Sequence, residues 1–177
     1  PIRISREDDE EGNDRPAVID FGDYFVDESA FTSIYSKYHE TTVIKIETDT
    51  GIAGWGEAQS PVAPRITQAI VEDLVRPLVL GRDPFDIEAI WTRNFGAMRE
   101  RGHPTGFYVD AIGGTDIALW DIVGKATGKP VHKLAGGRYR EKVKLYAGLG
   151  GTDPEKVADA AEEHVSFWGL CCCCVEM

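Results

Sequence analysis

The strongest constraint on this chain is a pair of short segments that predict one β-hairpin. Residues 42–48 alternate between two sets of side chains with the period of two that a half-buried strand requires. A turn at 49–51 follows, and the chain returns through residues 52–57 as a second strand, whose two glycines let another backbone come close. An earlier strand is expected within 18–26. Together these segments predict a three-stranded antiparallel meander.

Helical patterns replace the strand pattern after residue 60. Ser60-Pro61 and Asp83-Pro84 each join a capping residue to a proline suited to the first helical position, so each predicts the start of a helix. The first helix is expected to bury one stripe of apolar residues spaced by four: Ile66, Ile70, Leu74 and Leu78. The second is expected to bury Ile87, Ile90, Trp91 and Phe95.

A third helix is expected over 107–126, ending at Gly128. Its apolar positions are Ile112, Leu119, Trp120 and Val123. Residues 143–147 then predict a strand, and Asp153-Pro154 predicts one more capped helix. Strands followed by helices, and only then a strand–helix unit, indicate an α+β domain that precedes the opening of an α/β domain. We place the boundary near Arg140.

Composition excludes several classes of partner. The 30 acidic and 19 basic residues give a formal net charge of −11, which repels phosphate backbones and anionic membrane surfaces, so neither nucleic acid nor a membrane is expected. No stretch reaches the roughly 18 to 20 apolar residues of a membrane-spanning helix. The four cysteines are consecutive, at 171–174, so no disulfide framework is expected and a cytoplasmic location fits best. The charged block at 6–14 is expected to be a mobile loop.

Two segments carry a resemblance to a known family. The first is VIKIETDTGIAGWGEA at 43–58, and the second is AIGGTDIALWDIVGK at 111–125, followed by PVHKLAGG at 130–137. In order and separation they resemble the N-terminal hairpin and the third capping-domain helix of the mandelate racemase and muconate lactonizing branch of the enolase superfamily. The resemblance covers about residues 20–165.

This resemblance implies a capping domain that closes the mouth of a (β/α) barrel. The expected fold class is therefore α+β: a three-stranded antiparallel meander, then a three- to four-helix bundle as in the enolase N-terminal domain, then the first strand–helix unit of an incomplete barrel. Residues 1–140 would form the capping domain, 141–165 the first strand and helix, and 166–177 an aberrant tail. Since such a barrel takes roughly 250 residues, most of it is missing from this chain.

The resemblance also implies a reaction for a full-length parent. In enzymes of this kind Mg²⁺, held by acidic residues of middle barrel strands, stabilises the enediolate formed when a base removes the proton beside a substrate carboxylate. Those strands are not in this chain, so no catalytic residue, no metal ligand and no bound Mg²⁺ is expected in it, and the fragment alone should be inactive. The segment Arg101-Gly102-His103 before the third helix resembles the acid-sugar dehydratases of the family.

Three readings of function therefore stay open. The first is a parent that dehydrates an acid sugar, a small-molecule carboxylate. The second is a racemase or cycloisomerase, and the third is a non-catalytic binding module that kept the capping fold. A homo-oligomer is also expected, because in this chain the faces of the 107–126 helix and the 143–147 strand that normally pack on the barrel would be exposed and favour self-association.

Substrate specificity in the family implies two capping loops, which fall by position at about 24–39 and 58–61. The candidate substrate-contacting residues in them are Phe25, Phe31, Tyr35, Lys37, Tyr38, Gln59 and Ser60. Aromatic walls mixed with hydrogen-bonding groups suit a polyhydroxylated acid.

Other conspicuous residues are expected to be structural. Asp121 and Lys125, four apart on one helix, predict an ordinary surface ion pair. Glu57 is expected to cap a turn or pair with a backbone donor rather than touch substrate. Three tryptophans are expected to fill the core: Trp55, Trp91 and Trp120. The histidines lack metal-binding spacing: His39, His103, His132 and His164.

The sequence changes character after Val165, where the family pattern would continue into a second barrel strand bearing lysines. Four adjacent cysteines do not suit zinc, whose ligand pairs are normally separated by two or more residues. We therefore interpret residues 166–177 as the product of a shifted reading frame or a truncated gene.

Overall fold

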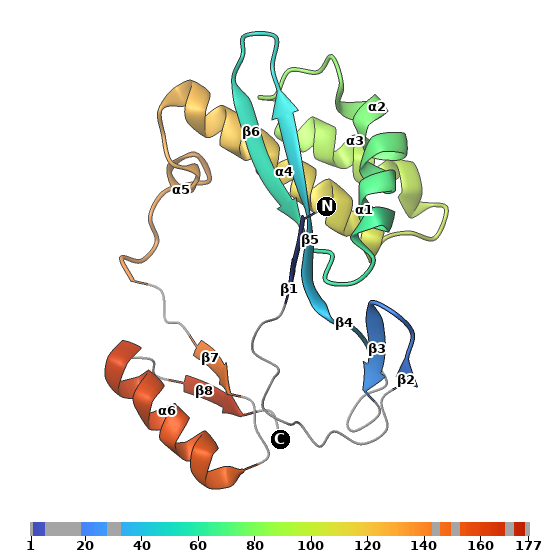
Figure 1. The fold of residues 1–177 in the computed structure, drawn as a ribbon. Helices are drawn as coiled ribbons and strands as arrows, with labels where there is room; N and C mark the ends of the chain where they lie inside the picture. Colours follow the sequence, from blue (N-terminus) through green and yellow to red (C-terminus); the bar gives the residue numbers. More distant parts are fainter. Residues whose placement is uncertain are drawn as a thin grey trace. The chain divides into compact units, whose positions relative to one another are not determined.

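The computed structural model describes residues 2–5, 19–27, 33–142, 146–149, 153–168 and 172–175. The chain divides into two compact units, Pro1–Ala135 and Gly136–Met177, each of which is described by itself (Figure 1). The expected charged loop at 6–14 lies outside the described residues.

The first unit is built on a three-stranded antiparallel sheet in the order β1-β5-β6. β5 (Tyr38–Glu47) is central: its first part pairs with β1 (Ile2–Ser5), and Thr42 to Glu47 pair with β6 (Ala53–Ala58). Gly51, at φ 83°, makes the turn between β5 and β6 in a conformation that glycine adopts without strain. The predicted hairpin and the three-stranded meander are confirmed.

Strand structure is present within 18–26 as expected, but it does not belong to the meander, whose first strand is β1. Those residues instead contribute β2 (Ile19–Asp20) and β3 (Tyr24–Asp27) to a second antiparallel sheet, completed by β4 (Ser33–Ser36). A turn interrupts the run because the Asp20 carboxylate accepts a hydrogen bond of 3.1 Å from the Gly22 N–H and Gly22 has φ 88°.

Helices pack on the main sheet, through α1 and α4, and on one another, as expected for an α+β domain. They are α1 (Pro64–Ile70), the π-helical segment η1 (Val71–Val75), α2 (Arg76–Val79), α3 (Ile87–Arg99), α4 (Phe107–Thr127) and the short α5 (Val131–Leu134). The third predicted helix is confirmed as α4, and Gly128 ends it in the left-handed conformation.

The centre of the domain is the crossing of α4 over β6. A side chain at Gly56 would place its Cβ 1.9 Å from the Gly114 carbonyl oxygen, and one at Gly54 would place it 2.1 Å from the Ala118 carbonyl oxygen. The backbones therefore touch, as the glycines of the second strand predicted. Two apolar clusters flank this crossing, one around Ile112 and one around Leu119.

The first helix differs from the prediction in its start and in its buried face. It begins at Pro64, after Ala63 at φ 52°, because the Ser60 side chain bonds elsewhere and leaves the helix uncapped. Ile66 and Leu74, predicted to be buried, are 46% and 41% exposed. The buried face lies one residue further along, at spacings of four: Thr67, Val71, Val75 and Val79 are its buried and half-buried members.

Two further expectations need correction. α3 begins at Ile87, because Asp83 accepts a hydrogen bond from the Phe85 N–H at 2.9 Å and so closes a turn before the helix. Trp55 is 52% exposed and outside the core, since Gly54 and Gly56 occupy the helix-facing side of β6 and alternation turns Trp55 to the other side. Trp91 and Trp120 do pack against the two apolar clusters.

The second unit contains β7 (Tyr146–Leu149), α6 (Pro154–Trp168) and β8 (Cys172–Val175). The predicted helix is confirmed, with Asp153 accepting from the Glu155 N–H at 3.1 Å. The predicted strand overlaps β7, and residues 143–145 lie outside the described residues. β8 pairs in parallel with β7, so the tail interpreted as aberrant contains a strand of a β–α–β unit.

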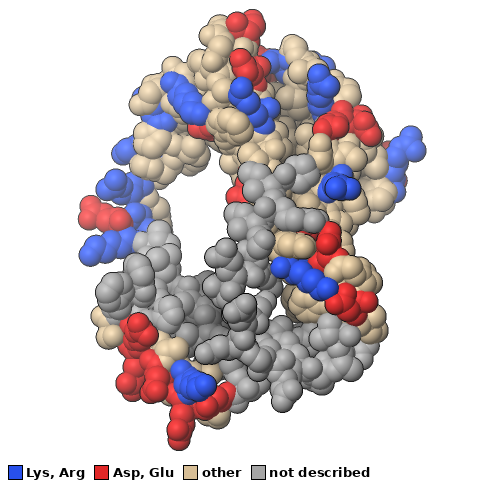
Figure 2. Space-filling model, viewed as in Figure 1, with Lys and Arg blue, Asp and Glu red and all other residues tan. Residues whose placement is uncertain are grey.

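The described surface fits the expected charge balance. Acidic side chains gather over α6, whereas both signs are mixed over the first unit (Figure 2). In the part of the chain that the structure covers, no helix is long and apolar enough to cross a membrane.

Candidate functional site

The β2–β3–β4 sheet carries an aromatic pair. Phe25 on β3 and Tyr35 on β4 are directly opposite each other in the strand register. Their rings stack with centroids 5.6 Å apart and planes inclined by 25°. Tyr35 is 41% exposed and Phe25 is half-buried, so the pair offers a partly open apolar surface.

A cation lies directly after the last strand of this small sheet, in the bend between β4 and β5. The Lys37 ammonium donates to the Asp20 carboxylate at 2.5 Å, and the Lys37 backbone N–H donates to the Asp23 carbonyl at 2.9 Å. The hydrogen bond from Lys37, followed by that from the Gly22 N–H, lowers the pKa of Asp20 from its usual value. Because exposed ion pairs contribute little to stability, the Lys37 ammonium can exchange Asp20 for a ligand carboxylate at small cost.

A buried polar pair holds the junction between β4 and β5. The Ser36 hydroxyl donates to the Glu40 carboxylate at 2.9 Å and accepts from the Tyr38 N–H at 3.1 Å. Ser36 and Glu40 are both buried, and Tyr38 is half-buried. This bonding fixes the direction in which the chain leaves β4, and with it the positions of Lys37 and Tyr38.

The two candidate residues of the second predicted loop differ in exposure. Gln59 is exposed. Ser60 is 1% exposed, and its hydroxyl donates to Thr42 Oγ1 at 3.0 Å, which in turn donates to the Pro64 carbonyl at 3.0 Å. Ser60 therefore joins β5 to the start of α1 and has no open face toward a ligand.

One hydrogen bond links the two predicted loops. The Ala63 N–H donates to the Tyr24 hydroxyl at 3.2 Å, which ties the corner before α1 to β3. The structure thus pairs Phe25 with Tyr35 on one sheet, brings Lys37 to Asp20, the residue opposite Phe25 on β2, and connects this sheet to the segment that holds Gln59. Phe31 lies outside the described residues. The sequence analysis missed Asp20 and Tyr24, although an aspartate two residues before a glycine is a recognisable turn signal.

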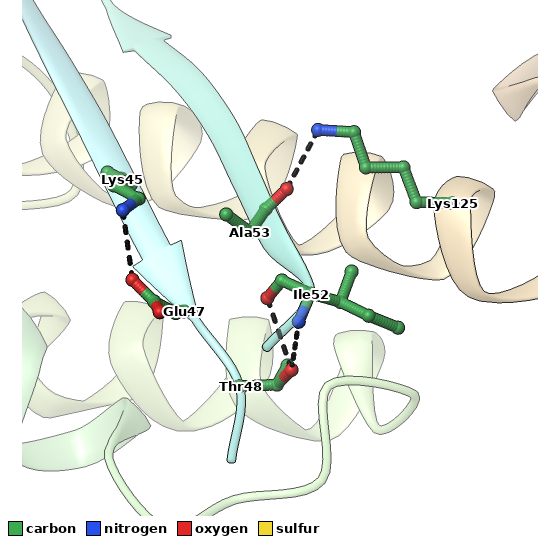
Figure 3. A network of polar contacts seen from close by, with 6 residues as sticks. All are labelled: Lys45, Glu47, Thr48, Ile52, Ala53 and Lys125. Atoms are coloured by element: carbon green, nitrogen blue, oxygen red, sulfur yellow. Dashed lines mark hydrogen bonds and ion pairs between the residues drawn. The ribbon is translucent and has the colours of Figure 1, made fainter. Parts of the chain in front are cut away.

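A second polar cluster lies on β6 and α4. The Asp121 carboxylate accepts from the Trp55 N–H at 2.8 Å and from the Lys125 ammonium at 2.7 Å, and that ammonium also donates to the Ala53 carbonyl at 2.7 Å. The bond from Lys125, then that from Trp55, lowers the pKa of Asp121. Figure 3 shows Lys125 reaching Ala53 from α4. The predicted ion pair is present, and it also binds the outer edge of β6.

Glu57, weighed above as a possible substrate contact, has a partner inside the domain. Its carboxylate accepts from the Thr41 hydroxyl at 2.7 Å. The expected partner was a turn or a backbone donor, whereas the structure supplies a side-chain hydroxyl from β5.

The described residues do not form a metal centre. Nowhere in the described ranges do three His, Cys, Asp or Glu side chains gather so that they could hold an ion. The Mg²⁺ implied by the resemblance has no ligand set in those ranges. The described arrangement is suited to recognition: a stacked aromatic pair, an exchangeable cation and polar groups around them.

Comparison with known proteins agrees with this fold. The chain is 46% identical over 114 residues to a D-galactonate dehydratase of Pectobacterium atrosepticum, a match that covers 64% of this chain and 29% of that protein. The crystal structure of a candidate isomerase from Sinorhizobium meliloti superposes with a TM-score of 0.85 at 40% identity, covering 93% of this chain and 43% of that one. The chain thus spans less than half the length of these relatives.

A further relative binds a metal. The structure of a mandelate racemase/muconate lactonizing protein from Paracoccus denitrificans was solved in complex with magnesium; it matches with a TM-score of 0.66 at 28% identity, covering 76% of this chain and 37% of that chain. Residues 28–136 of the present chain match the family described as mandelate racemase / muconate lactonizing enzyme, N-terminal domain. The chain belongs to this family of the enolase superfamily and carries its N-terminal domain.

Proposed function

We propose that the first unit is the substrate-capping part of an enzyme that dehydrates an acid sugar. The observation that carries this proposal is the stacked Phe25–Tyr35 pair on one small, partly exposed sheet, with the Lys37 ammonium bonded to Asp20, the residue opposite Phe25. Aromatic faces pack against the C–H groups of a sugar chain, while an ammonium binds its carboxylate. The similarity to a D-galactonate dehydratase supports the same substrate class.

In this proposal the chain contributes recognition and no chemistry. Dehydration removes the proton beside the carboxylate and expels the β-hydroxyl, and Mg²⁺ supplies charge stabilisation for that step when bound to the complete active site. Phe25 and Tyr35 would orient the carbon chain, Lys37 would hold its carboxylate, and Tyr38 and Gln59 would bind hydroxyl groups. Phe31 belongs to the same proposed set, whereas Ser60 positions the loop through Thr42.

An isomerase is the second candidate, because the Sinorhizobium meliloti relative is a candidate isomerase. Racemases and cycloisomerases of this family also act on carboxylates, so the same cation would serve them. A cytoplasmic location, self-association and a domain boundary near Arg140 are further parts of the proposal. The first is supported by a sequence whose only cysteines are the four consecutive ones at 171–174, and the second by exposed apolar residues such as Ile66 and Leu74.

A hybrid enzyme tests the proposal. Residues 1–140 of this chain would replace the corresponding part of the Pectobacterium atrosepticum D-galactonate dehydratase, and the product would be screened for keto-acid formation from a panel of acid sugars. We expect turnover of at least one acid sugar, and loss of most of it in a Phe25→Ala, Tyr35→Ala double variant. Turnover confined to carboxylates without hydroxyl groups, or a double variant as active as its parent, would contradict the proposed function.

A further inference from the structure

A small cavity of about 10 Å³ lies between α3 and α4. Three polar side chains line it, those of Asn94 on α3 and of Thr115 and Asp116 on α4. The rest of its wall is apolar and is drawn from both apolar clusters of the domain: Ile90, Trp91, Ile112 and Leu119. A cavity of this size holds about one water molecule and no organic ligand.

The side-chain oxygen of Asn94 is buried at this cavity and has no hydrogen-bond partner among the described residues. Asn94 is 2% exposed, and its amide nitrogen donates to the Ile90 carbonyl at 2.9 Å, which fixes the orientation of the amide. The Tyr108 hydroxyl donates to the Asn94 backbone carbonyl at 2.7 Å and holds this turn of α3 against α4. Because a buried amide oxygen without a donor loses the hydrogen bonds that water gives it in the unfolded chain, a donor is expected within its reach.

The other polar groups of the cavity do not supply this donor. The Thr115 hydroxyl donates to the Ala111 carbonyl of its own helix at 2.9 Å. Asp116 is half-buried; burial raises the pKa of its carboxyl, whereas a hydrogen bond from the Trp120 indole lowers it. An ionised carboxylate only accepts hydrogen bonds, and the indole uses one of its several acceptor positions. The amide oxygen and this carboxylate are therefore two acceptors at one cavity, and an occupant that bonds to both must donate twice.

We propose that this cavity binds one buried water molecule, which donates one hydrogen to Asn94 Oδ1 and the other to the Asp116 carboxylate and so joins α3 to α4. Water has the two donors and the size that the site requires, and buried waters typically make two to four hydrogen bonds to groups without other partners. The apolar part of the wall shields these bonds from bulk solvent. The water belongs to the packing of α3 on α4, so it does not depend on the proposed substrate.

Nuclear Overhauser effects between water and the full chain test for this molecule. We expect cross-peaks from water to the methyl groups of Ile112 and Leu119, with the sign that distinguishes a water held inside a protein from one that hydrates its surface. Asn94→Leu keeps nearly the same side-chain shape without the oxygen and should abolish them, whereas Asp116→Asn keeps an acceptor and should retain them. Thr67→Val removes a buried hydroxyl that does not line this cavity, so as the matched control it should leave them unchanged.

The lack of these cross-peaks in the folded, unsubstituted chain overturns the proposal. Their survival in Asn94→Leu also overturns it, because a signal relayed through the exchangeable hydroxyl proton of Thr115 would persist in that variant. If Asn94→Leu does not fold, Asp116→Leu, which removes the second acceptor, decides in the same way: loss of the cross-peaks supports the water and their retention overturns it. A melting temperature that depends on the kind of monovalent cation at constant ionic strength, without the cross-peaks, would assign the cavity to a cation and overturn the proposal as well.

Discussion

The carboxylate of Asp121 on α4 accepts a hydrogen bond of 2.8 Å from the backbone N–H of Trp55 on β6, although the two residues are 66 positions apart in the chain. Lys125, one helical turn further on, bonds both to Asp121 and to the Ala53 carbonyl. Two side chains of α4 thus satisfy the outer edge of β6, which would otherwise offer unpaired backbone groups to another strand.

Removing this carboxylate should loosen the edge of β6. Asp121→Ala is expected to lower the free energy of unfolding by about 1 kcal/mol, since it deletes one charge-assisted hydrogen bond at a half-exposed site. Chemical denaturation measures the effect. Asp73→Ala, which removes an exposed carboxylate from the helical segment η1, serves as the matched control and should change stability little. Equal losses in both variants would show that the Trp55 bond contributes nothing.

The same bond should make stability depend on acid pH. The pKa of Asp121 is lowered in the folded state, first by Lys125 and then by Trp55, from a usual value of 3.8. A lowered folded pKa contributes stability above the unfolded value, which is lost as the pH falls through the folded one. The stability difference between the native chain and Asp121→Asn should therefore shrink as the pH falls below about 4. A difference that stays constant down to pH 2 would rule this out.

Asp116 should behave in the opposite sense. Burial, and secondarily the charge of Glu88, raises the pKa of this carboxyl, while a hydrogen bond from Trp120 lowers it. A raised folded pKa means that folding favours the protonated form, a contribution that is lost as the pH rises through the folded pKa. Asp116→Asn, which keeps an acceptor for Trp120, should therefore raise the melting temperature at pH 7 and have less effect near pH 4. A lower melting temperature at pH 7 would show that the carboxylate is needed.

The largest destabilisation is expected from a substitution at the crossing of α4 over β6. Gly56→Ala would place a methyl group 1.9 Å from the Gly114 carbonyl oxygen, so the helix or the strand must move. We expect a loss of about 3 kcal/mol or more, at the upper end of overpacking effects. Gly96→Ala on α3 meets nothing within 4 Å and should stabilise the chain by about 0.5 to 1 kcal/mol. Equal denaturation midpoints for the two variants would contradict the close contact between β6 and α4 at Gly56.

Lys37 provides the functional test within the hybrid enzyme. Lys37→Met should raise KM for an acid sugar about tenfold with little change in kcat, as the loss of one charged contact made equally in the ground and transition states predicts. Lys129→Met removes an exposed lysine beyond α4 and should leave KM unchanged. Asp20→Asn removes the carboxylate that bonds to Lys37 and keeps the Lys37 ammonium, so KM should not rise. An unchanged KM in Lys37→Met would remove Lys37 from the proposed set.

The chain by itself should form no keto acid from D-galactonate or other acid sugars, with or without Mg²⁺. Within its described ranges no metal-binding cluster is present, and its proposed part is recognition. The assay is run beside the Pectobacterium atrosepticum enzyme as a positive control. Metal-dependent turnover by the purified chain would place catalytic residues where none are assigned.

The candidate site shows how far residue patterns alone could reach. Their place in the capping loops that the resemblance implies selected Phe25, Tyr35 and Lys37; in the structure the first two are opposite each other on β3 and β4, and Lys37 directly follows β4. Position in the loop could not distinguish Gln59, which is exposed, from its neighbour Ser60, whose hydroxyl is buried against Thr42. Loop residues lack the periodicity that separates inside from outside, so only their tertiary partners decide which of them faces a ligand.

The sequence by itself determined the hairpin of β5 and β6, the extent of α4 and its stop at Gly128, because alternation, helical spacing and glycine conformations act within a few residues. Only the tertiary structure decided that Trp55 faces outward, that the first helix buries Val75 rather than Leu74, and that residues near 20 form a separate sheet. These outcomes depend on which distant surface each element meets. Backbone contact between Gly56 and Gly114 settles the inner side of β6, and local patterns carry no information about a partner that far along the chain.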